Sequence, residues 1–288
     1  MGSQRLILVD GSGYIFRAFY ALPPMSREDG TPVNAVFGFT SMLLKLSEDM
    51  EGENILVVFD AARTTFRNTI YREYKANRSE PPEELVPQFD LIKKATTAIG
   101  LKSLEVENYE ADDIIATYVK IAKKENIETL VISSDKDLMQ LIQDGVSLYD
   151  PMKNIKIGPE AVLEKFGVSP DKVIDVQALA GDSSDNVPGV PGIGVKTASQ
   201  LINEYGSLEK LLDNASSIKQ EKRRESLLNN AELAIVSKKL VSLFSDVPIP
   251  YKISDLKWTP KLVYMNRQKY FKRLKRLKNY KIINVKNI

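Results

Sequence analysis

The chain has 288 residues, 43% of them hydrophobic, and contains no cysteine and no histidine. These absences exclude disulfides, thiolate nucleophiles, imidazole bases and ordinary zinc sites, so any metal must be bound by oxygen, as Mg²⁺ and Mn²⁺ prefer. The net charge of +2 combines an acidic body with a stretch from residue 257 that holds 11 basic residues and no acidic one. No apolar run approaches the roughly 20 residues that span a bilayer, and no signal-peptide pattern is present, which predicts a soluble cytoplasmic protein.

Short apolar runs alternate with helix-like stretches in the first half of the chain. The predicted elements, in chain order, are a strand at 5–9, helices at 14–22 and 34–49, a strand at 54–59, helices at 83–98 and 110–125, and a strand at 129–132. Strands that alternate with helices favour a parallel sheet covered on both faces. After about Gly158 the strand pattern fades, and helices broken by glycines are predicted.

Each of the three predicted strands is followed by an acidic residue: Asp10, Asp60 and Asp135. In parallel sheets the carboxyl ends of the strands meet at one edge, which is where ligands bind. Crowding like charges there is costly unless cations lie between them. The sequence therefore predicts a cluster of carboxylates that binds cations. Acids in neighbouring segments complete the candidate set: Glu110, Asp112, Asp113, Asp137, Asp182 and Asp185.

Two Mg²⁺ or Mn²⁺ ions about 4 Å apart would neutralise such a cluster and support phosphodiester hydrolysis without histidine. Each carboxylate also has an ordinary structural explanation. Asp112 and Asp113 fit the first turn of a helix, Asp135 fits a helix cap, and Asp182 fits a turn. The ordinary explanation is favoured for any one residue alone, whereas the convergence of the strand ends favours a metal site.

A glycine-rich turn at 189–194 precedes a helix predicted to begin at about Lys196. It is not a P-loop, because Val195 separates Gly194 from Lys196, and it is not a dinucleotide fingerprint, because Thr197 stands where glycine is required. The N–H groups at the start of the helix would bind a DNA phosphate. An ordinary connection between two helices explains the segment equally well.

Residues 61–80, directly after Asp60, mix basic and aromatic side chains. These side chains are Arg63, Phe66, Arg67, Tyr71, Arg72, Tyr74, Lys75 and Arg78. Beside metal ions, such cations would bind phosphates, and a tyrosine would stack on an exposed base. A solvated charged face is the alternative. Arg17 is similarly predicted to reach the scissile phosphate, with a surface ion pair as its alternative.

Several motifs occur together in one order. They are LVDG at 8–11, VFD at 58–60, TFR at 65–67, YKANR at 74–78, YEADD at 109–113, DKDL at 135–138, GDSSDN at 181–186 and PGIG at 191–194. This set resembles the 5′ nuclease module of bacterial DNA polymerase I, which is related to flap endonucleases and phage 5′ exonucleases. The resemblance covers about residues 4–255.

The resemblance implies an α/β fold with a parallel-sheet, PIN-like nuclease domain at 1–165 and a helical arch at about 61–80. An all-helical, helix-three-turn-helix DNA-binding region at 166–256 and a basic tail at 257–288 would follow. The implied first metal site comprises Asp10, Asp60, Glu110, Asp112 and Asp113, and the second comprises Asp135, Asp137, Asp182 and Asp185. Lys75 and Arg78 would contact the reacting phosphate. Further DNA contacts are expected at Arg63, Arg67, Tyr71, Arg72, Tyr74, Gly189, Gly192, Gly194, Lys196 and Thr197, with K⁺ at the glycine turn.

The sequence thus predicts a monomeric, structure-specific 5′-3′ exonuclease or 5′-flap endonuclease. Its substrates would be DNA 5′ ends or flaps at the nucleoid, and a polymerase could be a partner in trans. Two alternatives stay open, a catalytically silent DNA-structure binder and a related metal-dependent ribonuclease. The glycine turn at 189–194 disfavours the ribonuclease. The basic tail could be a DNA-binding arm, a membrane-surface helix or an ending with no role, and non-specific attraction to DNA is favoured.

Overall fold

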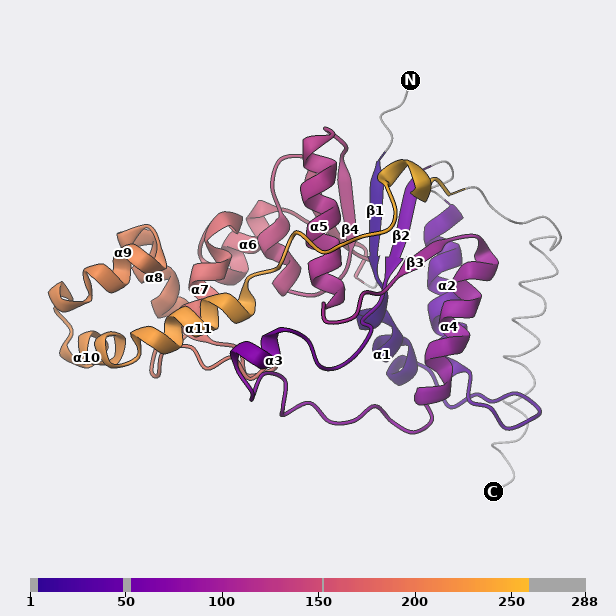
Figure 1. The fold of residues 1–288 in the computed structure, drawn as a ribbon, viewed down its shortest axis with the longest axis horizontal. Helices are drawn as coiled ribbons and strands as arrows, with labels where there is room; N and C mark the ends of the chain where they lie inside the picture. Colours follow the sequence, from indigo (N-terminus) through magenta and orange to yellow (C-terminus); the bar gives the residue numbers. More distant parts are fainter. Residues whose placement is uncertain (1–4, 49–52, 152, 259–288) are drawn as a thin grey trace. The chain divides into compact units, whose positions relative to one another are not determined.

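The computed structural model describes residues 5–48, 53–151 and 153–258 (Figure 1). The described chain falls into two compact units, each built from separate stretches of sequence. Unit 1 holds the residues up to Asp10, Val58–Glu80 and Glu105–Pro250. Unit 2 holds Gly11–Val57, Pro81–Leu104 and the residues from Tyr251 onward. Of the predicted basic tail, residues 259–288 lie outside the described residues.

The sheet of unit 1 contains four strands in the order β1, β4, β5, β6. Their bounds are Leu6–Asp10 for β1, Thr129–Ile132 for β4, Val146–Asp150 for β5 and Ile155–Ile157 for β6. β1 and β4 are parallel, with Leu6 opposite Thr129, as are β4 and β5, whereas β6 is antiparallel to β5. All five residues of β1 are buried, as expected of a parallel strand covered on both faces. The parallel pairing brings the carboxyl ends of β1 and β4 to one edge.

Helix α5 (Ala111–Lys124) packs on β1 and β4. Its acidic first turn and the lysines of its last turn both suit the helix dipole. Beyond the sheet, α7 (Val173–Ala180) packs against α8 (Val195–Tyr205) and α11 (Ala231–Val241). The remaining helices of unit 1 are α3 (Arg67–Ile70), η1 (Asp137–Leu141), α6 (Pro159–Phe166), η2 (Pro170–Lys172), α9 (Leu208–Asp213), η3 (Ala215–Ser217) and α10 (Glu221–Asn229).

Unit 2 holds three longer helices and two adjacent strands. They are α1 (Gly11–Ala21), α2 (Asn34–Glu48), β2 (Asn54–Val58), α4 (Val86–Ile99) and β3 (Lys102–Leu104), followed by the short η4 (Ile253–Leu256). Helix α2 packs against α1 and α4. A proline in the first turn of α4 and Gly100 in left-handed conformation at its end fix both limits of that helix. None of the described helices is long and apolar enough to cross a membrane.

Every strand and helix predicted in the first half of the chain is present, although β3, β5 and β6 were not predicted. The segment 61–80, which was predicted as a helical arch, contains little helix. Within it only the four residues of α3 are helical, and most of 71–78 forms turns. These turns are held from outside, because the N–H of Lys75 donates to the carbonyl of Asp185 (2.9 Å) and the side chain of Asn77 donates to the carbonyl of Ser183 (2.7 Å). The N–H of Lys75 is therefore occupied outside the segment and cannot continue a helix.

Candidate active site

The first turn of α5 gathers one set of acids. Glu110 directly precedes the helix, and Asp112 and Asp113 lie in its first turn. Asp60, two residues beyond β2, accepts a hydrogen bond from the N–H of Ala111 at 2.8 Å. The positive end of the helix dipole favours these negative charges. Asp60 therefore lies at the start of α5.

A chain of hydrogen bonds joins the ends of β1 and β4. The hydroxyl of Ser133 donates to Asp10 Oδ2 at 2.8 Å, and the N–H of Asp135 donates to Ser133 Oγ at 3.0 Å. The N–H of Asp137 then donates to Asp135 Oδ1 at 2.9 Å. Asp10, Asp135 and Asp137 are thereby brought together at the carboxyl edge of the sheet, where the strand pattern placed Asp10 and Asp135.

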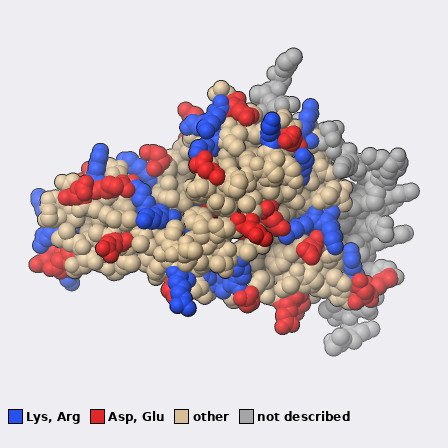
Figure 2. Space-filling model, viewed as in Figure 1, with Lys and Arg blue, Asp and Glu red and all other residues tan. Residues whose placement is uncertain are grey.

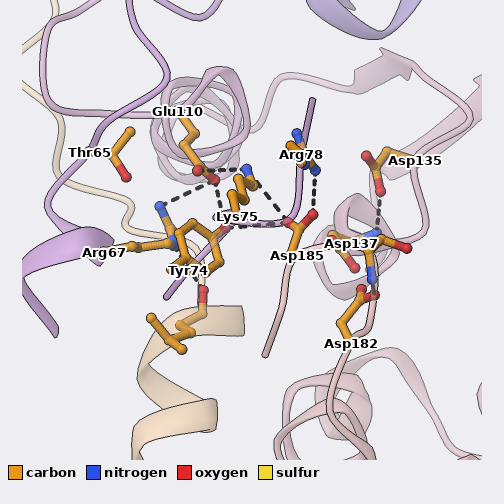
Figure 3. A network of polar contacts seen from close by, with 12 residues as sticks. Thr65, Arg67, Tyr74, Lys75, Arg78, Glu110, Asp135, Asp137, Asp182 and Asp185 are labelled. Atoms are coloured by element: carbon orange, nitrogen blue, oxygen red, sulfur yellow. Dashed lines mark hydrogen bonds and ion pairs between the residues drawn. The ribbon is translucent and has the colours of Figure 1, made fainter. Parts of the chain in front are cut away.

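The turn at 182–187 supplies two more acids from a distant part of the sequence (Figure 3). Asp182 and Val187 form a two-residue antiparallel bridge, and Asp182 Oδ1 accepts the N–H of Ser184 at 2.9 Å. Lys136 Nζ lies 2.6 Å from Asp182 Oδ2. Burial would raise the pKa of Asp182, but its bonds to Lys136 and Ser184 outweigh burial and lower it.

Two basic side chains of the 61–80 segment point at these acids (Figure 3). Lys75 Nζ lies 2.6 Å from Glu110 Oε1 and 3.5 Å from Asp185 Oδ2, and Arg78 forms an ion pair with Asp185. Burial alone would lower the pKa of Lys75, but the charges of Glu110 and Asp185 outweigh it, so the pKa is raised. Lys75 is therefore a firmly protonated donor beside the carboxylates.

A small pocket is lined by acids from all these segments, among them Glu110, Asp112, Asp137, Asp182 and Asp185. Burial raises the pKa of Asp112 well above its usual value, and the negative charges of Asp135, Asp10 and Asp60 raise it further. Burial and the charge of Asp135 also raise the pKa of Asp137 to about 7, against an opposing hydrogen bond from Gln177. The site thus carries more negative charge than its lysines and arginines neutralise.

Carboxylate oxygens are the donors that Mg²⁺ and Mn²⁺ prefer, and the excess negative charge would favour a divalent cation. In the described part of the chain, however, no three acidic side chains are arranged so that they could hold a metal ion together. Lys75, Arg78 and Lys136 pair with the acids instead. The site thus fits such ions by charge and donor type, and its side chains would have to rearrange to bind them.

Asp113 and Arg67, predicted as a metal ligand and a DNA contact, bind each other inside the protein. Arg67 is 1% exposed and Asp113 is fully buried. Two hydrogen bonds of 2.7 Å join the guanidinium of Arg67 to the two carboxylate oxygens of Asp113. Those oxygens also accept the N–H groups of Phe244 and Glu110. In this arrangement Asp113 is paired with Arg67 rather than open to a metal ion, and Arg67 is buried away from solvent.

Tyr74 and Gly189 also lie differently from their prediction as DNA contacts. Tyr74 is 5% exposed and packs with Val187, Leu240 and Val241, so it cannot stack on a base. Its hydroxyl donates to Glu110 Oε2 at 3.2 Å, and burial followed by the charge of Glu110 raises its pKa. The N–H of Gly189 is buried and donates to Ser237 Oγ at 2.9 Å, which removes it as a phosphate donor.

The other predicted DNA contacts remain at the surface. Arg63 and Arg72 are exposed, Tyr71 is half-buried, and Gly192, Gly194 and Lys196 are exposed, with Thr197 half-buried. Gly194 precedes α8, whose observed start at Val195 is within one residue of the prediction. Figure 2 shows acidic and basic side chains mixed over α8 to α11, so charge alone does not mark a DNA-binding face there. Arg17 is a half-buried residue of α1 in unit 2, and its role stays a prediction.

Three residues of the site were not singled out from the sequence. Lys136 lies inside the DKDL motif and could have been found as the cation between two acids. Ser133, which joins Asp10 to Asp135, precedes that motif by two residues. Gln177 donates to Asp137 Oδ1 at 2.5 Å from α7, and no pattern in the sequence points to it.

Comparisons with known proteins identify the family of the chain. A family model described as the 5′-3′ exonuclease N-terminal resolvase-like domain matches residues 5–167, and one described as the 5′-3′ exonuclease C-terminal SAM fold matches residues 168–262. DNA polymerase I of Rhizobium leguminosarum is 52% identical over 265 residues, which are 89% of this chain and 26% of the relative. DNA polymerase I of Bacillus caldotenax is 43% identical over 257 residues, which are 88% and 29%. The chain thus spans roughly a quarter of the length of these relatives.

Solved structures share the fold. T5 5′-exonuclease with bound zinc superposes with a TM-score of 0.71 at 25% identity, covering 84% of this chain and 90% of that one. The catalytic core of Rad2 in complex with DNA substrate gives a TM-score of 0.59 at 17% identity, covering 90% and 84%, and supports the fold alone. These matches confirm the predicted fold class, a mostly parallel α/β domain followed by a helical one. Since two family models together match residues 5–262 in the order that the motifs indicated, the chain belongs to the 5′-3′ exonuclease family.

Proposed function

We propose that this chain hydrolyses phosphodiester bonds of DNA near 5′ ends or at the base of 5′ flaps, with two Mg²⁺ or Mn²⁺ ions. The observation that carries the proposal is the pairing of Lys75 and Arg78 with Glu110 and Asp185, which line the acidic pocket, in a chain of this family. A T5 5′-exonuclease with 25% identity binds divalent zinc, and the T5 flap endonuclease with the same identity forms a complex with DNA and metal ions. Both support a metal-dependent nuclease.

The eight carboxylates left after Asp113 is set aside would hold the ions. They are Asp10, Asp60, Glu110, Asp112, Asp135, Asp137, Asp182 and Asp185. Divalent ions, when bound, supply the Lewis acidity that activates water and neutralises the charge developing on phosphate oxygens. Lys75 and Arg78 already point at these carboxylates, so they would bind and orient the phosphate and stabilise its negative charge.

The rest of the substrate would be recognised by structure. Exposed Arg63 and Arg72 would attract the single strand, and the start of α8 with Gly192, Gly194, Lys196 and Thr197 would bind the duplex backbone, with K⁺ at the turn. Neither contact reads a base sequence. We further propose that the chain works as a monomer on DNA in the cytoplasm, at the nucleoid, and that a polymerase is its partner, in trans or as part of a longer chain.

The test is cleavage of a labelled 5′-flap duplex in Mg²⁺, Mn²⁺ and EDTA. We expect cleavage that requires a divalent ion and falls at least about 10²-fold in Asp112→Asn, because that carboxylate lies in the acidic pocket. Asp144→Asn, which changes an exposed acid outside the site, is the matched control. Cleavage that persists in EDTA would refute metal dependence. Tight flap binding without turnover would support a silent DNA binder, and preference for an RNA flap would support the ribonuclease.

A further inference from the structure

Arg67 joins three segments that are distant in the sequence. Besides its two bonds to Asp113, its Nε donates to the carbonyl of Leu240 at 2.8 Å and its Nη2 to the carbonyl of Ser242 at 2.9 Å. The separations are 46 residues to Asp113 and 173 to Leu240. One buried guanidinium thus connects the segment 61–80, the first turn of α5 and the end of α11.

Asp113 passes this constraint to the neighbouring acids. Its Oδ2 accepts the N–H of Glu110 at 3.1 Å, and its Oδ1 accepts the N–H of Phe244 at 2.8 Å. Asp112 precedes it in the same helical turn, and Glu110 Oε2 lies 3.5 Å from Arg67 Nη1. The backbone that carries Glu110 and Asp112 is therefore held on one side by a fully bonded ion pair.

We propose that Arg67 is a positioning residue, which acts through Asp113 to hold the first turn of α5 so that Glu110 and Asp112 face the acidic pocket. This inference rests on the proposed function. Burial excludes direct contact of Arg67 with DNA. A buried ion pair is also a weak source of stability, because desolvation offsets much of its attraction. The main effect of the Arg67–Asp113 pair is to fix geometry, since a guanidinium can satisfy two carboxylate oxygens and two carbonyls at once.

Lysine cannot reproduce this arrangement, because its ammonium is a single point of charge. The experiment therefore compares Arg67→Lys, Asp113→Asn and the double variant, with Arg27→Lys at an exposed turn as the matched control. Four quantities are measured: the melting temperature, flap affinity in EDTA, Mn²⁺ affinity by calorimetry, and kcat and KM for flap cleavage at a temperature where every variant is folded.

We expect Arg67→Lys and Asp113→Asn each to lower kcat and weaken Mn²⁺ binding by about 10- to 100-fold, as loss of groups that orient metal ligands does. Flap affinity in EDTA should stay unchanged, and the double variant should be no worse than the poorer single one, because the pair acts as a unit. Should Arg67→Lys not fold, Asp113→Asn decides by the same readouts.

Two results would overturn the proposal. A lower melting temperature with unchanged kcat and Mn²⁺ affinity would make the pair merely structural. A weaker flap affinity of Arg67→Lys in EDTA would restore Arg67 as a phosphate contact, because lysine keeps the positive charge and loses only the paired contacts of the guanidinium. If wild-type protein shows no turnover at all, the proposed function fails instead. The Mn²⁺ affinities of the folded variants then still show whether Arg67 and Asp113 position the metal-binding carboxylates.

Discussion

Replacing Lys75 with methionine removes the positive charge between two carboxylates while keeping most of the side-chain volume. Lys75 is 18% exposed, and its Nζ lies 2.6 Å from Glu110 and 3.5 Å from Asp185. Removing one partner of a buried pair costs about 3 to 5 kcal/mol, because the other charge stays buried and uncompensated. Asp185 keeps Arg78, so we expect the free energy of unfolding without divalent ions to fall by about 2 to 3 kcal/mol.

A divalent ion bound by the same acids would replace the missing charge. In saturating Mg²⁺ we therefore expect the loss to shrink by at least about 1.4 kcal/mol, which by linkage means about tenfold tighter Mg²⁺ binding. Flap cleavage should nevertheless fall about 10²- to 10³-fold, because a phosphate donor is lost.

The measurement is urea unfolding followed by circular dichroism, in EDTA and in Mg²⁺, together with calorimetric titration of Mg²⁺. Lys165→Met on the exposed face of α6 is the control and should change the free energy of unfolding by less than about 0.5 kcal/mol. Equal destabilisation of Lys75→Met in EDTA and in Mg²⁺ would refute the reasoning, because Lys75 and the ion would then not compete for the same carboxylates.

Three further predictions concern other parts of unit 1. Because the pKa of Asp137 is raised to about 7, its contribution to stability is complete below about pH 4 and is lost as pH rises through 7. In EDTA, the melting temperature of Asp137→Asn should therefore fall less steeply with pH than that of the wild type. An unchanged dependence of melting temperature on pH would contradict the raised pKa of Asp137. A Cβ at Gly189 (φ +62°) would lie 2.7 Å from the backbone Cα of Gly181, whereas at Gly192 (φ +79°) nothing lies within 4 Å. Urea unfolding should show that the free energy of unfolding falls by more than about 2 kcal/mol in Gly189→Ala and by about 1 kcal/mol in Gly192→Ala. Equal losses would count against the steric cause. Lys196→Ala should weaken duplex binding and reduce its salt slope by about 0.9, and a wild-type slope would exclude a phosphate contact.

The strands that carry the acids were predictable from local patterns. β1 and β4 are short, nearly continuous apolar runs, and parallel pairing necessarily brings their carboxyl ends together. The positions of Asp10 and Asp135 follow from that geometry. The three-residue strands β3 and β6 are too short for a period-two pattern, which explains why they were missed.

The roles of Arg67, Asp113 and Tyr74 could not be read locally. A basic and aromatic stretch after Asp60 has the same composition whether its side chains face solvent or the interior. Only tertiary contacts decide, and the partners of Arg67 lie 46 and 173 residues away. Asp113 does lie in the first turn of a helix, but that position alone does not reveal its buried ion pair with Arg67. The low helix content of residues 71–78 has the same cause, because their hydrogen-bonding partners come from the turn at 182–187.

The bonds between residues 73–77 and that turn have a consequence for how Lys75 can move. Asn186 returns a hydrogen bond to the carbonyl of Glu73 at 2.7 Å, so the two segments are fastened in both directions. Lys75 is thereby fixed to a turn that lies only a few peptide bonds before Gly192 and the start of α8. If phosphates bind at both places, the span between them is a fixed length of polypeptide. Movement of Lys75 relative to the start of α8 would then require breaking the bonds between residues 73–77 and the turn at 182–187.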